Sequence, residues 1–219
     1  MAGAGEVTFV FADLSGYTAL TEAHGNDGAA TVIHRYMDIA REGLPADARI
    51  VERVGDEVVI ATASAVTAVH IALSLRARVA REPRFPALRI GVHRGDVIEE
   101  DGHFIGAALN VAARVTARAL AGQVVCTAAV VQAAPATADV TYRPLGHVRL
   151  RNLARPVALY EVCGDHVPSP VFIDPVCRMQ VTAESAVRVL TVGDVQRYFC
   201  SITCADAFEA APGDFAESR

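Results

Sequence analysis

Two aspartates are the first residues of this 219-residue chain whose type and spacing indicate chemistry. Asp13 follows a short apolar run, and Asp56 stands in a Gly-Asp turn between two further apolar runs. If those runs pair as strands, both carboxylates can reach the same end of a sheet, where carboxylate oxygens suit Mg²⁺. Taken singly, each aspartate is better explained by ordinary turn chemistry, in which its side chain bonds nearby backbone.

Asn110 and Arg114 form a second pair with a useful spacing. They stand four residues apart in an expected helix, so they share one face, one turn apart. An amide and a guanidinium placed there can reach a common ligand, and the planar fork of arginine can neutralise charge on a transferring phosphoryl group. The alternative for Arg114 taken by itself is an exposed helical arginine.

Three of the five cysteines fall near the C-terminus, at Cys177, Cys200 and Cys204. The last two lie one helical turn apart and can converge on one ion. Soft thiolates select Zn²⁺, Cu⁺ or related metals, and a short segment without a large core is commonly stabilised by a structural metal. The alternative is a set of three buried, reduced cysteines.

The elements that must position these residues indicate an α+β sandwich, with helices on one face of a largely antiparallel sheet. A helix is expected across residues 32–43, a second one is capped by Ser64, and a third opens at Gly106. Residues 88–93 and 96–98 read as two strands of one hairpin. The other expected strands cover residues 7–12, 49–53, 57–61, 124–126 and 157–162.

Composition sets limits on the class of protein. Hydrophobic residues make up 52% of the chain and charged residues 21%, which is enough for a packed core and excludes disordered and collagen-like classes. A net charge of -5 without a basic block argues against a nucleic-acid polymer as partner. Neither a membrane span nor a secretory signal is evident, so we expect a cytoplasmic protein with reduced thiols.

A change in composition predicts the domain boundary. Residues 164–173 are rich in Asp, His, Pro and Ser, and Pro168 and Pro170 stiffen the chain, so this stretch is expected to be a linker. The expected domains are residues 1–163 and residues 174–219.

Residues 1–163 resemble the class III nucleotidyl cyclases. The similarity covers about residues 5–163, and four successive motifs carry it, at residues 9–18, 51–56, 89–95 and 104–114. The resemblance implies a ferredoxin-like catalytic domain that acts as a homodimer and converts ATP or GTP to the 3′,5′-cyclic nucleotide and pyrophosphate.

The resemblance also implies a role for each residue of the two pairs. Asp13 and Asp56 of one protomer would hold two Mg²⁺ or Mn²⁺ ions at the dimer interface. Asn110 and Arg114 of the other protomer would orient the ribose and stabilise the transition state. Each active site would therefore be shared between two copies of the chain.

The position of the nucleotide base is where the sequence departs from the cyclase pattern. Adenylyl members usually carry Lys and Asp at the positions matched by Glu52 and His103, whereas guanylyl members typically carry Glu and Cys. Ionised Glu52 can accept from guanine N1–H and its amino group, and His103 can donate to O6, which slightly favours GTP over ATP. The alternatives are two surface side chains, or a degenerate nucleotide-binding and dimerisation module coupled to a metal-sensing domain.

The C-terminal segment resembles the YHS domain, a relative of the TRASH metal-binding modules. Residues 174–179, residues 198–201, Cys204 and Phe208 carry this similarity, which departs from the family at Arg178, where Gly is usual. The resemblance implies a metal of the Zn or Cu type at the three thiols, either regulating the cyclase or merely tethered to it. Candidates for a fourth ligand are Asp174, Met179 or water.

Overall fold

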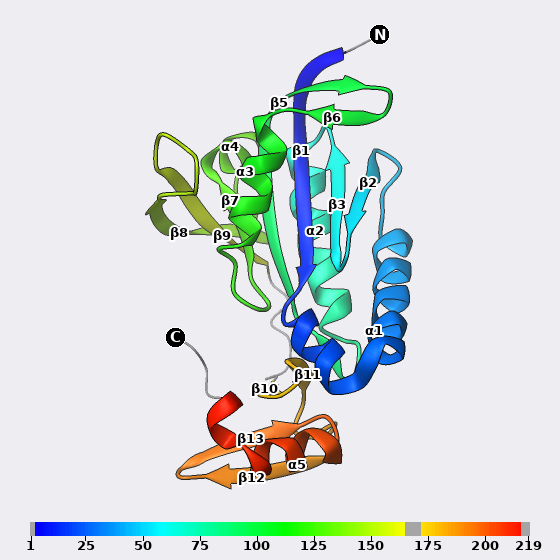
Figure 1. Cartoon of the computed structure of the whole chain (residues 1–219). Coiled ribbons are helices and arrows are strands. Elements are labelled where there is room, and N and C mark those ends of the chain that lie inside the picture. Colours follow the sequence, from blue (N-terminus) through cyan, green and yellow to red (C-terminus); the bar gives the residue numbers. More distant parts are fainter. Residues whose placement is uncertain (1–2, 165–171, 216–219) are drawn as a thin grey trace.

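The computed structural model describes residues 3–164 and 172–215, and a large twisted sheet forms its centre. The sheet is flanked by helices, and a small group of C-terminal elements lies beyond the end of β1 (Gly3–Leu14) (Figure 1). Among the described residues, no helix combines the length and the apolar character that crossing a bilayer requires.

The first half of the chain has the ferredoxin-like arrangement that the sequence predicts. Its sheet has the order β2-β3-β1-β5, with β1 pairing antiparallel to both of its neighbours. The elements in chain order are β1, α1 (Tyr17–Glu42), β2 (Ala48–Val54), β3 (Glu57–Thr62), α2 (Ala65–Val79), β4 (Phe85–Pro86) and β5 (Leu88–Glu100). Helix α2 begins at the predicted cap, because the Ser64 side chain accepts a hydrogen bond from the Thr67 amide.

The second half extends the same sheet to the order β2-β3-β1-β5-β7-β9-β8, with β6 added beside β5. Its pairings are antiparallel except for that of β5 with β7. The elements are β6 (His103–Ile105), α3 (Ala107–Thr116), β7 (Val124–Thr127), α4 (Ala128–Ala133), β8 (Val140–Val148) and β9 (Val157–Gly164).

Helices cover both faces of the sheet, so the expectation of helices on one face is wrong. Val10 and Ala12 of β1 join the main core with α1 and α2. Phe9 and Phe11, which alternate with them, pack against α3 in a second core. The helical pattern of α3 alone could not reveal its face, because an amphipathic helix packs equally well on either side of a sheet whose strands are apolar on both faces.

The strand β5 is one continuous strand, whereas the sequence predicts a hairpin within it. Residues 88–99 pair along the whole of β1 without a turn. The hairpin comes later, where Asp101 and Gly102 both have positive φ and connect β5 to β6. Gly95 resembles a turn signal in the sequence but lies inside the strand, packed against Ala108 and His93.

The C-terminal elements dock on the ferredoxin-like part. Strand β11 (Met179–Val181) pairs with β4 from the first half of the chain and with β10 (Phe172–Ile173). The remaining elements are β12 (Arg188–Val192), β13 (Val195–Phe199), α5 (Ile202–Ala210) and the short 3-10 helix η1 (Pro212–Phe215). Most of the predicted linker 164–173 lies outside the described residues, and the predicted domain boundary stays a prediction.

Candidate active site and cysteine cluster

The two predicted aspartates lie together at one end of the sheet. Asp13 is near the end of β1, buried and paired in register with Arg89. Asp56 is in the β2–β3 turn, which Gly55 makes possible by its positive φ. Strand β3 pairs with β1, so the turn is carried to the end of β1, and the Asp13 carboxyl group comes close enough to that of Asp56 to raise its pKa.

The acidic side chains at this end of the sheet are close together, and two of them have raised pKa values. Burial, and then the hydrogen bond and charge of Asp13, raise the pKa of Asp56 to about 6. The neighbouring Glu57 has its pKa raised to about 7, by burial first and then by Asp13 and Asp56. Asp56 and Glu57 therefore resist ionisation beside Asp13, and the three carboxyl groups form a set of oxygen donors whose repulsion a divalent cation would relieve.

Two residues of this acidic end were missed by sequence reasoning. Arg89 donates from Nε to Asp13 Oδ2 and supplies positive charge inside the cluster. Glu57 directly follows Asp56 in the sequence, and this adjacency could have indicated that it belongs to the acidic end. Arg89 is the first residue of the cyclase-like motif at residues 89–95, but only strand pairing shows that it faces Asp13.

A buried tyrosine fixes the strand that carries Asp13. The hydroxyl of Tyr36, from α1, donates to the carbonyl of Ala12 at 2.8 Å. Its pKa is raised well above the usual value, chiefly by burial and then by the charge of Asp13, so it remains a neutral donor. The end of β1 is therefore tied to the core immediately before the carboxylate.

Asn110 and Arg114 are both on α3, as predicted, but this chain does not join them to its own carboxylates. Ala108 and Ala112 face the sheet, so Asn110 and Arg114 lie on the opposite side of the helix. Arg114 Nη1 donates to the carbonyl of Asn110 at 2.6 Å. In the described part of the chain, no ion pair links Arg114 with Asp13 or Asp56.

The structure places the two base-pocket candidates apart. Glu52 is exposed on β2, immediately after a β-bulge, and pairs with Val59 on the face that α3 covers. His103 is exposed at the start of β6, where it pairs with Glu100. That end of β5 lies beside Gly3, at the opposite end of β1 from Asp13. Within the described residues, no hydrogen bond joins Glu52 to His103.

The three C-terminal cysteines do come together. Cys177 and Cys200 have their Sγ atoms 3.4 Å apart, and those of Cys200 and Cys204 are 3.8 Å apart. All three residues are buried, and none forms a disulfide. The thiols of Cys177 and Cys200 lower the pKa of the Cys204 thiol by hydrogen bonding to it, so one thiolate is favoured in the cluster.

Asp174 stabilises the loops that carry these cysteines, because both of its carboxylate oxygens accept hydrogen bonds from backbone amides. Its Oδ1 accepts from the amides of Val176 and Cys177 at 2.8 and 3.3 Å, and its Oδ2 accepts from the amide of Cys200 at 2.8 Å. Asp174 therefore links the two cysteine loops and is not the fourth member of the cluster. Met179 is in β11, paired with Pro86.

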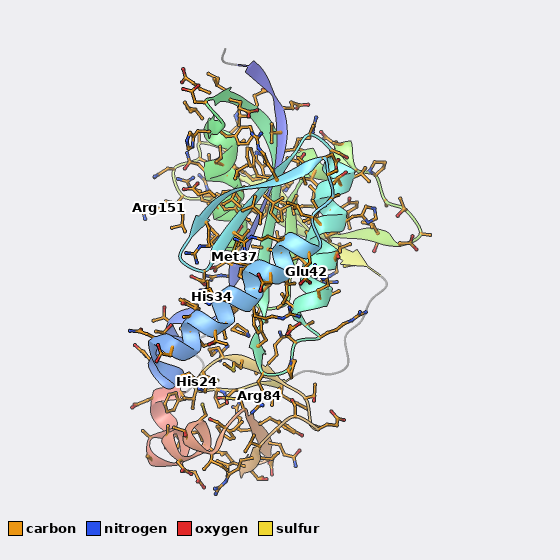
Figure 2. The ribbon with its side chains drawn as sticks, turned by 90° about the vertical axis from the view of Figure 1, so that its right-hand side faces the viewer. His24, His34, Met37, Glu42, Arg84 and Arg151 are labelled. Atoms are coloured by element: carbon orange, nitrogen blue, oxygen red, sulfur yellow. The ribbon has the colours of Figure 1, made fainter. Side chains whose placement is uncertain are left out.

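The fourth member is His24, which sequence reasoning missed. Its ligand nitrogen and the three sulfur atoms all lie within 4.8 Å of one another. His24 comes from α1, far from the cysteines in the sequence, and no local spacing could have identified it. Figure 2 shows His24 at the end of α1 that lies against the C-terminal elements.

Comparison with known proteins matches residues 1–162 to the family model described as the adenylate and guanylate cyclase catalytic domain. A putative adenylate cyclase of Rhizobium meliloti (strain 1021) is 30% identical over 68% of this chain and 27% of its own length. A pH-sensitive adenylate cyclase of Mycobacterium tuberculosis (strain CDC 1551 / Oshkosh) is 31% identical over 73% of this chain and 41% of its own length. The chain thus spans less than half the length of these curated relatives.

Solved structures share the fold of the same region. The adenylyl cyclase CyaB from P. aeruginosa superposes with a TM-score of 0.65 and 20% identity, covering 78% of this chain and 100% of that one. The guanylate cyclase domain of RhGC from Catenaria anguillulae in complex with GTP gives a TM-score of 0.62 and 19% identity, covering 73% and 96%. The family match ends before the cysteine cluster, so the predicted YHS similarity stays a prediction.

Proposed function

The chain belongs to the adenylate and guanylate cyclase catalytic domain family, and from this we propose that it converts ATP or GTP to the 3′,5′-cyclic nucleotide and pyrophosphate. The observation that carries the proposal is the meeting of Asp13 and Asp56 at one end of the sheet, in a chain whose family performs this reaction. The proposed reaction needs no covalent intermediate on the protein, since the 3′-hydroxyl of the substrate attacks its own α-phosphorus.

The acidic end of the sheet would hold the catalytic metal. Asp13 and Asp56 are the proposed ligands, and their crowding with Glu57 fits a site for Mg²⁺ or Mn²⁺. Two such ions would lower the pKa of the 3′-hydroxyl and neutralise charge on the triphosphate. Tyr36 holds the backbone at Ala12 in place, so the chain itself keeps the Asp13 carboxylate oriented.

The remaining part of the site would come from a second copy of the chain. Asn110 and Arg114 face away from their own sheet, which leaves them available to a triphosphate held by a partner. Arg114 would have to leave the carbonyl of Asn110 to meet the charge that develops on the phosphoryl group. Asn110 would orient the ribose, and a homodimer would contain two such shared sites.

The nucleotide base would be read from the same side as Asn110 and Arg114. Glu52 is exposed on the face that α3 covers and can accept from guanine or from the amino group of adenine. His103 is proposed as its companion, although the two side chains share no hydrogen bond in the described chain. Substrate preference therefore rests on Glu52 more than on His103.

The C-terminal segment is proposed to be a YHS-type metal-binding module. The support is the convergence of Cys177, Cys200 and Cys204, whose soft thiolates suit a metal of the Zn or Cu type. Its contacts with the cyclase part make regulation possible, because β11 pairs with β4.

A second candidate function is a catalytically degenerate module that binds nucleotide and dimerises. The separation of Glu52 and His103 favours it, since a loosely defined base pocket can bind nucleotide without orienting it for reaction. Its output would be metal-dependent association rather than a product.

A product assay with ATP and GTP side by side, each with Mg²⁺ or Mn²⁺, tests the proposal. We expect cyclic nucleotide from at least one combination and a fall of at least about 100-fold in Asp13→Asn, since that change removes a charged ligand. Asp38→Asn, an exposed carboxylate on α1, is the matched control and should retain activity. Nucleotide binding with no product in any combination would instead establish the degenerate module.

A further inference from the structure

Four potential metal ligands converge between the two parts of the molecule. His24 belongs to α1 of the cyclase part, whereas Cys177, Cys200 and Cys204 belong to the C-terminal elements. Helix α1 has a break immediately after His24, where Gly25 adopts φ 70° and ψ 176°. The first segment of α1 therefore has its own direction, and His24 at its end lies within ligand distance of the three cysteines.

Four of the six separations between ligand atoms in this cluster are close to those of a tetrahedral site, and all six are within 4.8 Å. Zn–S bonds of about 2.3 Å and Zn–N bonds of about 2.0 Å place tetrahedral ligand atoms about 3.5 to 3.8 Å apart. The two measured Sγ–Sγ separations are 3.4 and 3.8 Å. His24 Nε2 lies 3.7 Å from Cys200 Sγ and 3.9 Å from Cys204 Sγ.

Hydrogen bonds around the cluster hold the loops that carry its cysteine ligands. Asp174 is buried and binds the amides that precede two of the three sulfur atoms, so the cysteine loops are held before any ligand enters. The Ser201 side chain accepts from the amide of Cys204 and caps α5, which fixes the third sulfur. The ligand loops are thus preorganised, and both backbone and side chains support them.

We propose that the four residues form a closed Cys3His site for Zn²⁺ or a metal of similar preference, and that the metal fastens the C-terminal segment to the cyclase part. Three thiolates and one imidazole are a ligand set typical of structural zinc. His24 is the ligand that matters most for this function, because it alone comes from the other side of the contact. Without it the metal would still bind, but it would hold only the C-terminal segment together.

The fastening acts close to the proposed active site. Arg178, which follows Cys177, packs directly over Gly16, so closely that a Cβ at Gly16 would overlap the Arg178 side chain. Gly16 lies three residues after Asp13 and precedes α1. A metal that binds the docked arrangement more tightly than the undocked one stabilises the docked arrangement, by linkage between binding and conformation. The site depends on no assumption about catalysis, and its readouts are independent of product formation.

Metal binding by the full chain is the direct test, with Co²⁺ as the spectroscopic probe. We expect one thiolate-bound Co²⁺ per chain under reducing conditions, with the absorption of a tetrahedral thiolate site, and its displacement by one equivalent of Zn²⁺. His24→Ala should weaken Zn²⁺ binding by at least about tenfold and change the Co²⁺ spectrum, because water replaces the imidazole. His24 is only partly buried, so this change should leave the fold intact.

Two matched variants control for general effects. His34→Ala removes an exposed histidine from the same helix, and Cys163→Ser removes a thiol from outside the cluster. Both should bind Zn²⁺ as the original chain does. An unchanged affinity and spectrum in His24→Ala would overturn the proposal, as would a chain that binds no Co²⁺ or Zn²⁺ at all.

Hydrogen exchange tests the fastening itself. Adding Zn²⁺ should slow exchange in residues 17–24 and in β11 at least about tenfold in the original chain. In His24→Ala the slowing should be confined to the C-terminal elements. Equal protection of residues 17–24 in both chains would show that the metal does not join the two parts.

Discussion

At the scale of single residues, the carboxylates of the two candidate sites have different partners. The acidic end of the sheet contains Asp13, Asp56 and Glu57, with Arg89 as an internal counter-charge on Asp13. The cysteine cluster instead places its one carboxylate, Asp174, on backbone amides behind the thiols. The first arrangement leaves oxygen atoms for a hard cation, and the second leaves only sulfur and nitrogen for a soft one.

Arg178 shows how a departure from a family pattern is accommodated. It has φ 63°, the left-handed conformation in which glycine is easiest and an arginine costs about 1 kcal/mol. The turn is nevertheless kept, because its amide donates to the carbonyl of Asp174 at 2.9 Å. The side chain that glycine would lack is the one that packs over Gly16.

His93 gives a pH-dependent contribution to stability. It is half-buried on β5, with Nδ1 2.8 Å from Thr127 Oγ1, and burial lowers its pKa from 6.5 to about 4. The unfolded chain therefore binds the proton more strongly between these values. The contribution of neutral His93 is complete above pH about 6.5 and is lost as the pH falls toward 4.

We expect the free energy of unfolding to decline less between pH 7 and about 4.5 in His93→Gln than in the original chain, by about 1 to 3 kcal/mol. Urea denaturation at several pH values measures the decline. The raised pKa values of Asp56 and Glu57 act in the opposite direction, so the comparison between chains is the decisive quantity. His70→Gln, at an exposed position of α2, should behave as the original chain does. Identical pH profiles for all three chains would show that His93 is not responsible.

At the scale of elements, the approach of α3 to the sheet determines where Asn110 and Arg114 stand. Gly91 of β5 lies against Thr116, the last residue of α3, whose Oγ1 donates to the carbonyl of Ala112 at 3.0 Å. A Cβ at Gly91 would overlap both Oγ1 and the backbone of Thr116. Backbone cannot move aside as a flexible side chain does, so the whole helix would have to shift.

Gly91→Ala should therefore lower the free energy of unfolding by about 1 to 3 kcal/mol, as overpacking does, and reduce any cyclase activity through the displaced α3. Thermal or urea unfolding and a product assay measure the two effects. Gly5→Ala is the control, because nothing lies within 4 Å of the added carbon. A Gly91→Ala chain as stable as the Gly5→Ala chain would contradict this account of the contact.

At the scale of the whole molecule, the proposed active site would be completed only when two copies meet. The carboxylates lie at the end of β1, whereas Asn110 and Arg114 project from the side of α3 that faces away from the sheet. A homodimer with two-fold symmetry places each half of the site against the complementary half of the partner. Mixing two inactive variants can then restore activity.

An equal mixture of Asp13→Asn and Arg114→Ala chains should recover roughly a quarter of the original activity, because half of the dimers are mixed and each has one intact site of two. Product formation after subunit exchange measures the recovery. The control is a mixture of Asp13→Asn with Asp56→Asn, which damages the same half of the site and should recover nothing. No recovery in the first mixture would contradict a site shared between two copies.

The sequence by itself predicted most strands of residues 1–163, the helices α1, α2 and α3, the acidic pair and the three thiols, because these depend on periodicity, turn residues and short spacing. The ferredoxin-like half of the sheet was implied by the resemblance to the cyclases, whereas the alternation of strands and helices by itself predicted only an α+β sandwich. It failed within residues 88–100, where a glycine inside a long strand resembles a turn. Local sequence patterns indicate only local geometry. A glycine can mark a turn, or it can mark a position in a strand where a neighbouring segment packs closely, and the sequence does not distinguish the two.

Only the tertiary structure decided that α3 covers the face opposite to α1, that Arg89 faces Asp13, and that His24 joins Cys177, Cys200 and Cys204. Each of these facts depends on which distant segments pack together. Such packing is determined by the burial of apolar faces over the whole chain. The polar side chains that it brings together have no characteristic separation along the sequence from which their contact could be predicted.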